Sequence, residues 1–582
     1  MASLYKKVIN GKPYWYLREM GWVDGKPKMV SERYLGSAAD IAAALDAREA
    51  AIRPERTRHL AFGDVAAAWG MLERLGVIAL IDEVVGARRR DAGASVGTYL
   101  ALAALGRLVD PCSKLGFEKW WRTTAADRFT KIGAGVLDHR KFWDAMHGVS
   151  HEQLARIEHR LAVGMVETFG LDISALALDM TNFATYIDTT NDHAPIAQRG
   201  KAKQKRADLR LIGLGLVITR DGGIPLVSHA YPGNRPDVTQ FAAMIELLVA
   251  RHTALAAALR PDPGDPDAAT PAAMAPTQVT VVFDAGQNSA ANLAHLDAAG
   301  LGFVGSIPPS DCPDLLARPA TDRHVVDSDR FPGVTALEDR RHVFGADRRV
   351  VLTHSQTLHT AQSRGFEQTL AKATAKLSAL GDTLARGHTR RARDKVTAEI
   401  TQIVKDPWVR RVVSCQLTGD TPTEHRLSFD LDEAARTDLE TEVFGKRVLM
   451  TDRDQWSTAD VVAGYRSQSE AEFGFRQLKD PHVVSFSPMH HWTEHNIRVH
   501  VFTCVLALQI AHLMRREAAH AGLHLSVREL LDTLAGIEET VLIYSSTGGR
   551  PKARRMLTET TDTQDRLAEI FDLHRWAPEL RS

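Results

Sequence analysis

Two aspartates stand at the ends of predicted buried strands, where a pair of carboxylates could bind a divalent cation. Asp179 ends the strand predicted in "SALALDMTNF", and Asp284 ends the one predicted in "VTVVFDAG". Carboxylates held close together repel unless a cation neutralises them, and Mg²⁺ prefers oxygen ligands. Two such ions about 4 Å apart would suit phosphoryl transfer. Taken alone, each aspartate could instead be a turn residue or a helix cap.

A third carboxylate, Glu472, lies in the predicted helix "YRSQSEAEFGFRQLKD" (465–480). Successive helical residues rotate by about 100°, which places several polar side chains on the stripe of Glu472. These are Tyr465, Gln468, Arg476 and Lys479. Glu470 falls about 160° away, on the opposite face. A carboxylate, a hydroxyl and cations on one stripe suit a metal-bound phosphodiester. The alternative is a solvated face with a chance Glu–Lys pair.

The elements that must position these residues follow the order β-β-β-α-β-α-β. The strands are predicted near 174–183, 210–219, 223–231, 279–286 and 300–307, with helices at 237–260 and after Ser289. With acids ending the first and fourth strands, this order indicates an α/β fold with a ribonuclease-H-like core. The core resumes with a strand at 447–454 and a helix capped by Ser457.

A chain of 582 residues is too long for one ordinary domain. Six segments are predicted: a small β-rich unit (1–59), a helical domain that could bind DNA (60–170), the first part of the core (171–310), an inserted mixed domain (311–445), the second part of the core with the Glu472 helix (446–515), and a helical, basic C-terminal region (516–582).

Lys+Arg and Asp+Glu both number 72, so any nucleic-acid binding must come from local patches. One candidate is "RGKAKQKRADLR" (199–210), with Lys203, Lys205 and Arg206, and the alternative is a solvated loop. The four cysteines lack zinc or redox spacing, which indicates a reducing compartment. The apolar run "VHVFTCVLALQIAHLM" is interrupted by His and Gln and predicts a buried helix. We therefore expect a cytoplasmic protein without a membrane partner.

Together these motifs resemble the DDE transposases of bacterial insertion sequences that carry the Y-R-E-K signature. That signature is Tyr, two residues, Arg, three residues, Glu, six residues and Lys. Tyr465, Glu472 and Lys479 fall in register, and Gln468 stands at the arginine position. The contexts "LALDMTNFATY", "VVFDAGQNSAANL" and "SPMHHWTEHNIRVHVFTCVLALQI" are also similar. The resemblance covers roughly residues 170–515.

The resemblance implies that Asp179, Asp284 and Glu472 bind catalytic Mg²⁺, with Mn²⁺ as a substitute. It implies nicking of DNA at the ends of an insertion sequence, followed by attack of the freed 3′-OH on target DNA. Terminal inverted repeats and target DNA would be the partners, and a homodimer would hold two ends in a synaptic complex. The signature positions Tyr465, Gln468 and Lys479 would contact DNA, and Arg476 could replace the missing arginine, whereas Arg466 points elsewhere in this helical phase.

Two other functions fit parts of the sequence. One is a catalytically silent, transposase-derived DNA-binding protein, which the arginine-to-glutamine departure at 468 leaves open. The other is a carboxylate-pair hydrolase such as a glycosidase. The basic segments and the third acid with Lys479 disfavour the hydrolase.

Overall fold

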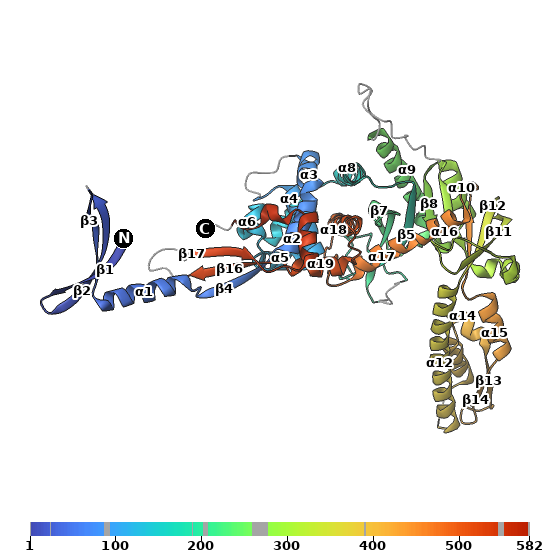
Figure 1. The fold of residues 1–582 in the computed structure, drawn as a ribbon. Helices are drawn as coiled ribbons and strands as arrows, with labels where there is room; N and C mark the ends of the chain where they lie inside the picture. Colours follow the sequence, from blue (N-terminus) through green and yellow to red (C-terminus); the bar gives the residue numbers. More distant parts are fainter. Residues whose placement is uncertain are drawn as a thin grey trace.

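The structure is a computed structural model of the chain. It describes residues 2–23, 25–86, 93–188, 190–201, 208–258, 278–388, 391–544 and 552–579. The basic residues Lys203, Lys205 and Arg206 lie outside the described residues, so their proposed DNA contact stays a prediction. The main body holds a large mixed sheet and many helices, with a three-stranded sheet projecting at the N-terminal end (Figure 1).

The large sheet has nine strands in the order β10-β11-β12-β15-β9-β8-β5-β6-β7. Their bounds are β5 Ala175–Thr185, β6 Arg210–Thr219, β7 Pro225–Pro232, β8 Thr280–Phe283, β9 Gly302–Ile307, β10 His324–Val325, β11 Val334–Val343, β12 Ala346–Ser355 and β15 Lys446–Thr451. Strands β5, β8 and β9 are parallel, and the other neighbours pair antiparallel. Strands β5 to β9 and the helices between them follow the predicted order, and the whole is consistent with a ribonuclease-H-like fold.

Strand β5 differs from the prediction because it does not end at Asp179. It continues to Thr185, paired all along its length with β6, so Asp179 lies in mid-strand opposite Leu216. Its pairing with β8 stops at Ala177. The long antiparallel ladder to β6 therefore holds the strand beyond the point where its parallel neighbour turns away.

Helices cover both faces of the β5–β6 region. Helix α9 (Phe241–Ala258) packs on β6 and β7, and α17 (Gln468–Lys479) packs on β5 and β6. Met180 on β5 lies beside Gly215, whose missing side chain leaves room for Met244 of α9. Strand side chains alternate between faces. Met180 faces α9, so Asp179 and Thr181, the residues on either side of it, face α17.

The helical segment predicted at 60–170 is present as seven helices in the described residues, with Tyr99, Trp121 and Phe142 fully buried among them. Their bounds are α2 Gly63–Arg74, α3 Val77–Val85, α4 Val96–Val109, α5 Lys114–Trp121, α6 Ala126–Thr130, α7 His139–His147 and α8 His151–Phe169. Helix α18 (Glu494–His520) packs against α2, α4 and α7. It is long and apolar enough to cross a membrane, but 94% of its most apolar stretch is buried inside the structure.

The C-terminal region is not wholly helical. Beside α19 (Val527–Ala535) and α20 (Asp562–Ile570) it contains β16 (Glu538–Tyr544) and β17 (Lys552–Leu557). Strand β16 pairs with β17 and with β4 (Arg56–Ala61), which joins the C-terminal region to the start of the helical domain. A pairing between strands almost 500 positions apart leaves no local signal in the sequence.

The predicted insertion at 311–445 has a different boundary in the structure. Residues 324–355 form β10, β11 and β12, which extend the large sheet. Cys312, Leu315 and Leu316 belong to the main core, whereas residues 356–445 form a separate hydrophobic cluster around Phe366, Leu377 and Phe444, below the sheet in Figure 1. Its elements are α12 Gln356–Ala385, α13 Arg393–Ile403, α14 Pro407–Val412, β13 Val413–Thr418, β14 Arg426–Leu431 and α15 Glu433–Glu442.

The N-terminal unit, which was predicted to be β-rich, contains a three-stranded antiparallel sheet in the order β1-β2-β3. Its strands are β1 Ala2–Ile9, β2 Lys12–Val23 and β3 Lys26–Gly36. It also has a helix that the β-rich prediction lacked, α1 (Ala38–Ile52), which leads to β4 and the body of the protein (Figure 1).

Candidate active site

Asp284 follows β8 directly and keeps the extended backbone of the strand, with φ −89° and ψ 165°. Its Oδ1 accepts three hydrogen bonds: from the Ala285 N–H at 2.8 Å, the Ser306 hydroxyl at 2.8 Å and the Tyr465 hydroxyl at 3.1 Å. No hydrogen bond to Oδ2 occurs within the described part of the chain. One oxygen is thus fixed by the protein, and the other is left for a ligand.

Asp179 lies on β5, the strand next to β8, which Asp284 follows. The parallel ladder pairs Ala175 with Thr280 and Ala177 with Val282. The pairing ends at that point, and Asp179 and Asp284 each lie two residues further along their own chains. Both side chains fall on the α17 side of the sheet by the alternation described above. The Met180 N–H donates to Asp179 Oδ1 at 2.7 Å.

Tyr465 comes from helix α16 (Thr458–Arg466), which begins as predicted with Ser457 as its N-cap. The tyrosine is only 9% exposed, and burial together with the Asp284 charge raises its pKa to about 12. The hydroxyl therefore keeps its proton at neutral pH and acts as a donor. The guanidinium carbon of Arg447 lies 5.6 Å from the centre of the tyrosine ring.

The predicted helix over 465–480 is divided at Ser467 into α16 and α17. The Ser467 hydroxyl donates to the Gly464 carbonyl at 2.6 Å, a local bond of the kind that competes with the helical ladder. The 100° phase therefore holds within α17 but does not run unbroken from Tyr465. Arg466, which the helical phase placed elsewhere, follows Tyr465 directly in α16 and lines the same pocket.

Within α17, two contacts to β5 fix the position of Glu472. Gln468 is buried and donates from Nε2 to the Leu178 carbonyl at 2.9 Å, and Lys479 Nζ donates to Thr181 Oγ1 at 2.7 Å. Glu472 is on the same stripe between these two residues. It is exposed and forms no hydrogen bond or ion pair within the described residues. Glu472 is thereby held above the stretch of β5 that contains Asp179.

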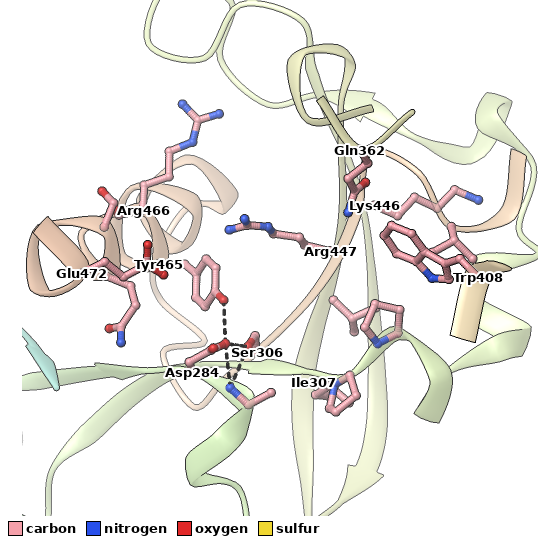
Figure 2. Close-up of a pocket in the computed structure, with 17 residues that line it drawn as sticks. Asp284, Ser306, Ile307, Gln362, Trp408, Lys446, Arg447, Tyr465, Arg466 and Glu472 are labelled. Atoms are coloured by element: carbon pink, nitrogen blue, oxygen red, sulfur yellow. Dashed lines mark hydrogen bonds between the residues drawn. The ribbon is translucent and has the colours of Figure 1, made fainter. Parts of the chain in front are cut away.

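A cavity of about 520 Å³ contains several of the predicted residues (Figure 2). Asp284, Tyr465, Gln468 and Glu472 line it, together with Ser306. Trp408 and Gln362 close it from the unit built around α12 and α14. Asp179, Arg476 and Lys479 do not line this cavity, and their proposed roles stay predictions.

Three cations line the cavity that the sequence did not single out as site residues: Lys446, Arg447 and Arg466. Burial lowers the pKa of Lys446 to about 8, with Arg323 adding to the effect. Arg447 reaches towards the Tyr465 ring in Figure 2. Lys446 and Arg447 reach the cavity because β15 pairs antiparallel with β9 and so begins at the sheet edge where Asp284 lies, a distant pairing without a local signal in the sequence.

Glu470 is separated from the cavity, as the helical phase predicted. Its carboxylate accepts a 2.6 Å hydrogen bond from Arg515 of α18, which also donates to the Gly222 carbonyl in the β6–β7 turn. The residue therefore ties α17 to α18 and is not a simple solvated side chain. The two glutamates of the stretch have different surroundings and different neighbours.

The chemistry of the cavity suits an anionic, oxygen-rich ligand. Two carboxylates, one phenolic donor and three cations surround it, and carboxylate oxygens are ligands for a hard divalent ion. The oxygen donors thus fit Mg²⁺ in kind. Among the residues that the structure describes, however, no group of three or more His, Cys, Asp or Glu side chains is close enough to hold one metal ion.

The sequence matches no known protein-family profile and no curated protein. Among solved structures, one similar chain is the piggyBac transposase in a synaptic complex with hairpin DNA. The TM-score is 0.30 and the identity 9%, over 81% of this chain and 70% of that chain. A similarity of this size does not decide fold or function.

Proposed function

We propose that this protein is a DNA transposase of the DDE type, which cuts the ends of an insertion sequence and joins the freed 3′-OH to target DNA. The observation that supports it is the meeting of Asp284 and Glu472 in one cavity with Tyr465, Arg447 and Arg466. Glu472 and Tyr465 are residues of the signature that the sequence resembles, and Asp284 is the second acid of the resembled triad. Asp284 follows a strand that is distant in sequence from the two consecutive helices that carry Tyr465 and Glu472.

In this proposal the cations hold the scissile phosphate. Arg447 and Arg466 would neutralise its non-bridging oxygens, as guanidinium groups do for phosphates elsewhere. Tyr465 keeps the Asp284 carboxylate oriented by its hydrogen bond. Oδ2 of Asp284 and Glu472 would hold Mg²⁺ in the cavity, and Asp179 would complete the set by moving towards them when the ion binds, since the three carboxylates are not clustered among the described residues. Bound Mg²⁺ would supply a more acidic water and stabilise the leaving oxygen.

Gln468 has a different part in the proposal from the arginine of the signature. Its amide is buried and donates to the Leu178 carbonyl, directly before Asp179. We infer that it positions β5 under α17, while Arg447 and Arg466 supply the positive charge. Because two element ends must be held together, the proposed active form is a homodimer on DNA.

The test uses duplexes that carry the short inverted repeats flanking the gene. Wild-type protein should nick these ends in Mg²⁺ and not in EDTA, leaving a 3′-OH that joins to a plasmid. Asp284→Asn should bind the same DNA without cutting it. Asp420→Asn, an exposed acid in the β13–β14 connection, is the matched control and should cut normally.

Binding without cleavage by the wild type would favour the catalytically silent alternative. Hydrolysis of a glycoside without a divalent metal would favour the carboxylate-pair hydrolase and contradict the proposal.

A further inference from the structure

The N-terminal sheet exposes apolar side chains to an extent found nowhere else in the described chain. Of the eighteen exposed large hydrophobic side chains in the described residues, nine lie in its three strands. They are Leu4, Tyr5, Val8, Ile9, Met20, Trp22, Met29, Val30 and Tyr34. Apart from Gly36, none of the described residues in 2–36 is buried. They are divided between the two faces of the sheet, and exposed apolar side chains in this number indicate a binding partner.

One face of this sheet carries a row of tyrosines across all three strands. Tyr5 pairs with Tyr16, and Tyr16 pairs with Tyr34, so the three stand side by side. The Tyr16 and Tyr34 ring centres are 5.2 Å apart. Tyr5 is 40% exposed and Tyr34 is 55% exposed, so the row faces solvent. We call Tyr5, Tyr16 and Tyr34 the tyrosine row.

Cations flank the tyrosine row on the same face. The guanidinium carbon of Arg18 lies 3.5 Å from the centre of the Tyr5 ring, and Lys7 Nζ lies 5.9 Å from that of Tyr16. By register, Lys7 stands opposite Tyr14 and Arg18 opposite Glu32. Aromatic rings and basic side chains thus alternate along the centre of the sheet, with Arg18 also ion-paired to Glu32 at 2.9 Å.

The segment is also basic as a whole, which distinguishes it from the rest of the chain. Residues 1–36 contain seven basic residues and three acidic ones. These are Lys6, Lys7, Lys12, Arg18, Lys26, Lys28 and Arg33, against Glu19, Asp24 and Glu32. Because the complete chain has 72 of each, the remainder is net acidic. The ligand of this sheet is therefore expected to be an anion that also offers flat apolar surfaces.

We propose that the tyrosine row is a stacking platform for single-stranded nucleic acid. Unpaired bases have two π faces that stack on aromatic side chains, and their phosphates are attracted by neighbouring Lys and Arg. Sheets that present aromatic residues in this way bind single strands by stacking two or three bases. The surface lies on a unit far from the candidate active site (Figure 1).

Two other occupants fit the observations less well. A second copy of the chain packed through the same face would set one basic sheet against another, and like charges repel. A DNA duplex keeps its bases paired and stacked, so it offers phosphates but no base faces to the tyrosine row. In the proposed function, the single strand would come from DNA opened at an element end. That link rests on the proposed function, whereas the binding itself does not.

The experiment compares two substitutions of the same two rings in the full-length protein. Tyr16→Leu/Tyr34→Leu keeps apolar side chains that suit a strand, and Tyr16→Phe/Tyr34→Phe keeps the rings. Binding of a fluorescein-labelled oligo(dT) of about 20 nucleotides is measured by anisotropy, beside a duplex of equal length. Leu4→Ala/Val8→Ala changes the opposite face and is the matched control.

The wild type should prefer the single strand over the duplex. The Leu variant should lose at least about tenfold in oligo(dT) affinity, since stacking contributes about 1–3 kcal/mol per base. The Phe variant and the Leu4→Ala/Val8→Ala control should bind as the wild type does, and circular dichroism should be unchanged in all three. Nicking of duplex element ends by the Leu variant is measured as well, because it tests the proposed function independently of single-strand binding.

Unchanged oligo(dT) affinity in the Leu variant would overturn the proposal. So would equal losses in the Leu and Phe variants, which would point to the hydroxyl groups. If light scattering shows that the Leu variant converts a dimer to a monomer while oligo(dT) binding persists, the face is a self-association surface and the platform is refuted.

Discussion

Tyr465 donates a 3.1 Å hydrogen bond to the Oδ1 of Asp284, although the two residues are 181 positions apart in the chain. The bond joins helix α16 to the end of strand β8. Between them in sequence lie three strands that widen the sheet and the whole unit built around α12. The chain thus leaves the site after Asp284 and returns to the same carboxylate.

Replacing Tyr465 with Phe should slow nicking by about tenfold. A hydrogen bond to a charged group contributes about 1.5–3 kcal/mol, but Ser306 and Ala285 still hold the carboxylate in the variant. The rate is measured under single-turnover conditions at saturating Mg²⁺. Tyr99→Phe removes another buried tyrosine bond, to the Val136 carbonyl, and should leave the rate unchanged. An unaffected rate in Tyr465→Phe would show that the bond is only structural.

Arg447→Gln should weaken binding to end DNA, and Arg476→Gln should not. Arg447 lines the cavity, whereas Arg476 is an exposed residue of α17 outside it. Losing one phosphate contact lowers the slope of log affinity against log salt by about 1. Affinity is measured by anisotropy at several salt concentrations in the Asp284→Asn background, so that no DNA is cut. The reverse ranking of the two variants would restore Arg476 as the substitute for the missing arginine.

Glu470→Gln should retain nicking and lose a little stability. The Glu470–Arg515 pair is partly exposed, and such pairs contribute about 0–1 kcal/mol. Urea denaturation gives the change in the free energy of unfolding, and the nicking rate gives the change in activity. A variant that is stable but inactive would place Glu470 in the catalytic machinery.

Lys114→Met should stabilise the protein, and more so at low pH. Lys114 is 7% exposed and forms no ion pair within the described chain; burial, with Arg107 adding, lowers its pKa to about 7. A lysine whose folded pKa lies below its unfolded value destabilises the fold below about pH 10.5, and this cost is complete below about pH 7. Urea denaturation at pH 6 and pH 9 should show the larger gain at pH 6. An equal gain in the free energy of unfolding at pH 6 and pH 9 would mean that unfolding does not change the protonation of Lys114.

Local patterns in the sequence were sufficient for much of the core. The order of strands from β5 to β9, the Ser457 cap and the buried helix α18 follow from apolar periodicity and capping residues that act over a few positions. The separation of Glu470 from Glu472 also follows from helical phase, because both residues lie within α17. Each of these features depends on neighbours in the chain.

Features that depend on distant pairing could not be predicted. The extension of β5 past Asp179 depends on its ladder to β6, and β16 finds β4 at the other end of the chain. The division of the predicted helix at Ser467 coincides with a single hydroxyl bond to the Gly464 carbonyl. Arg447 reaches the site through the pairing of β15 with β9. In each case the structure depends on a segment that is distant in the sequence or on a single side-chain contact.

The most direct measurement is Mg²⁺-dependent nicking of element-end DNA by Glu472→Gln beside Glu470→Gln. Both changes remove one negative charge from α17 with almost no change in volume. Only Glu472 lines the cavity with Asp284. The account predicts that Glu472→Gln binds the DNA but does not nick it, while Glu470→Gln nicks at close to the wild-type rate. Nicking by Glu472→Gln at the wild-type rate would contradict the assignment of the active site.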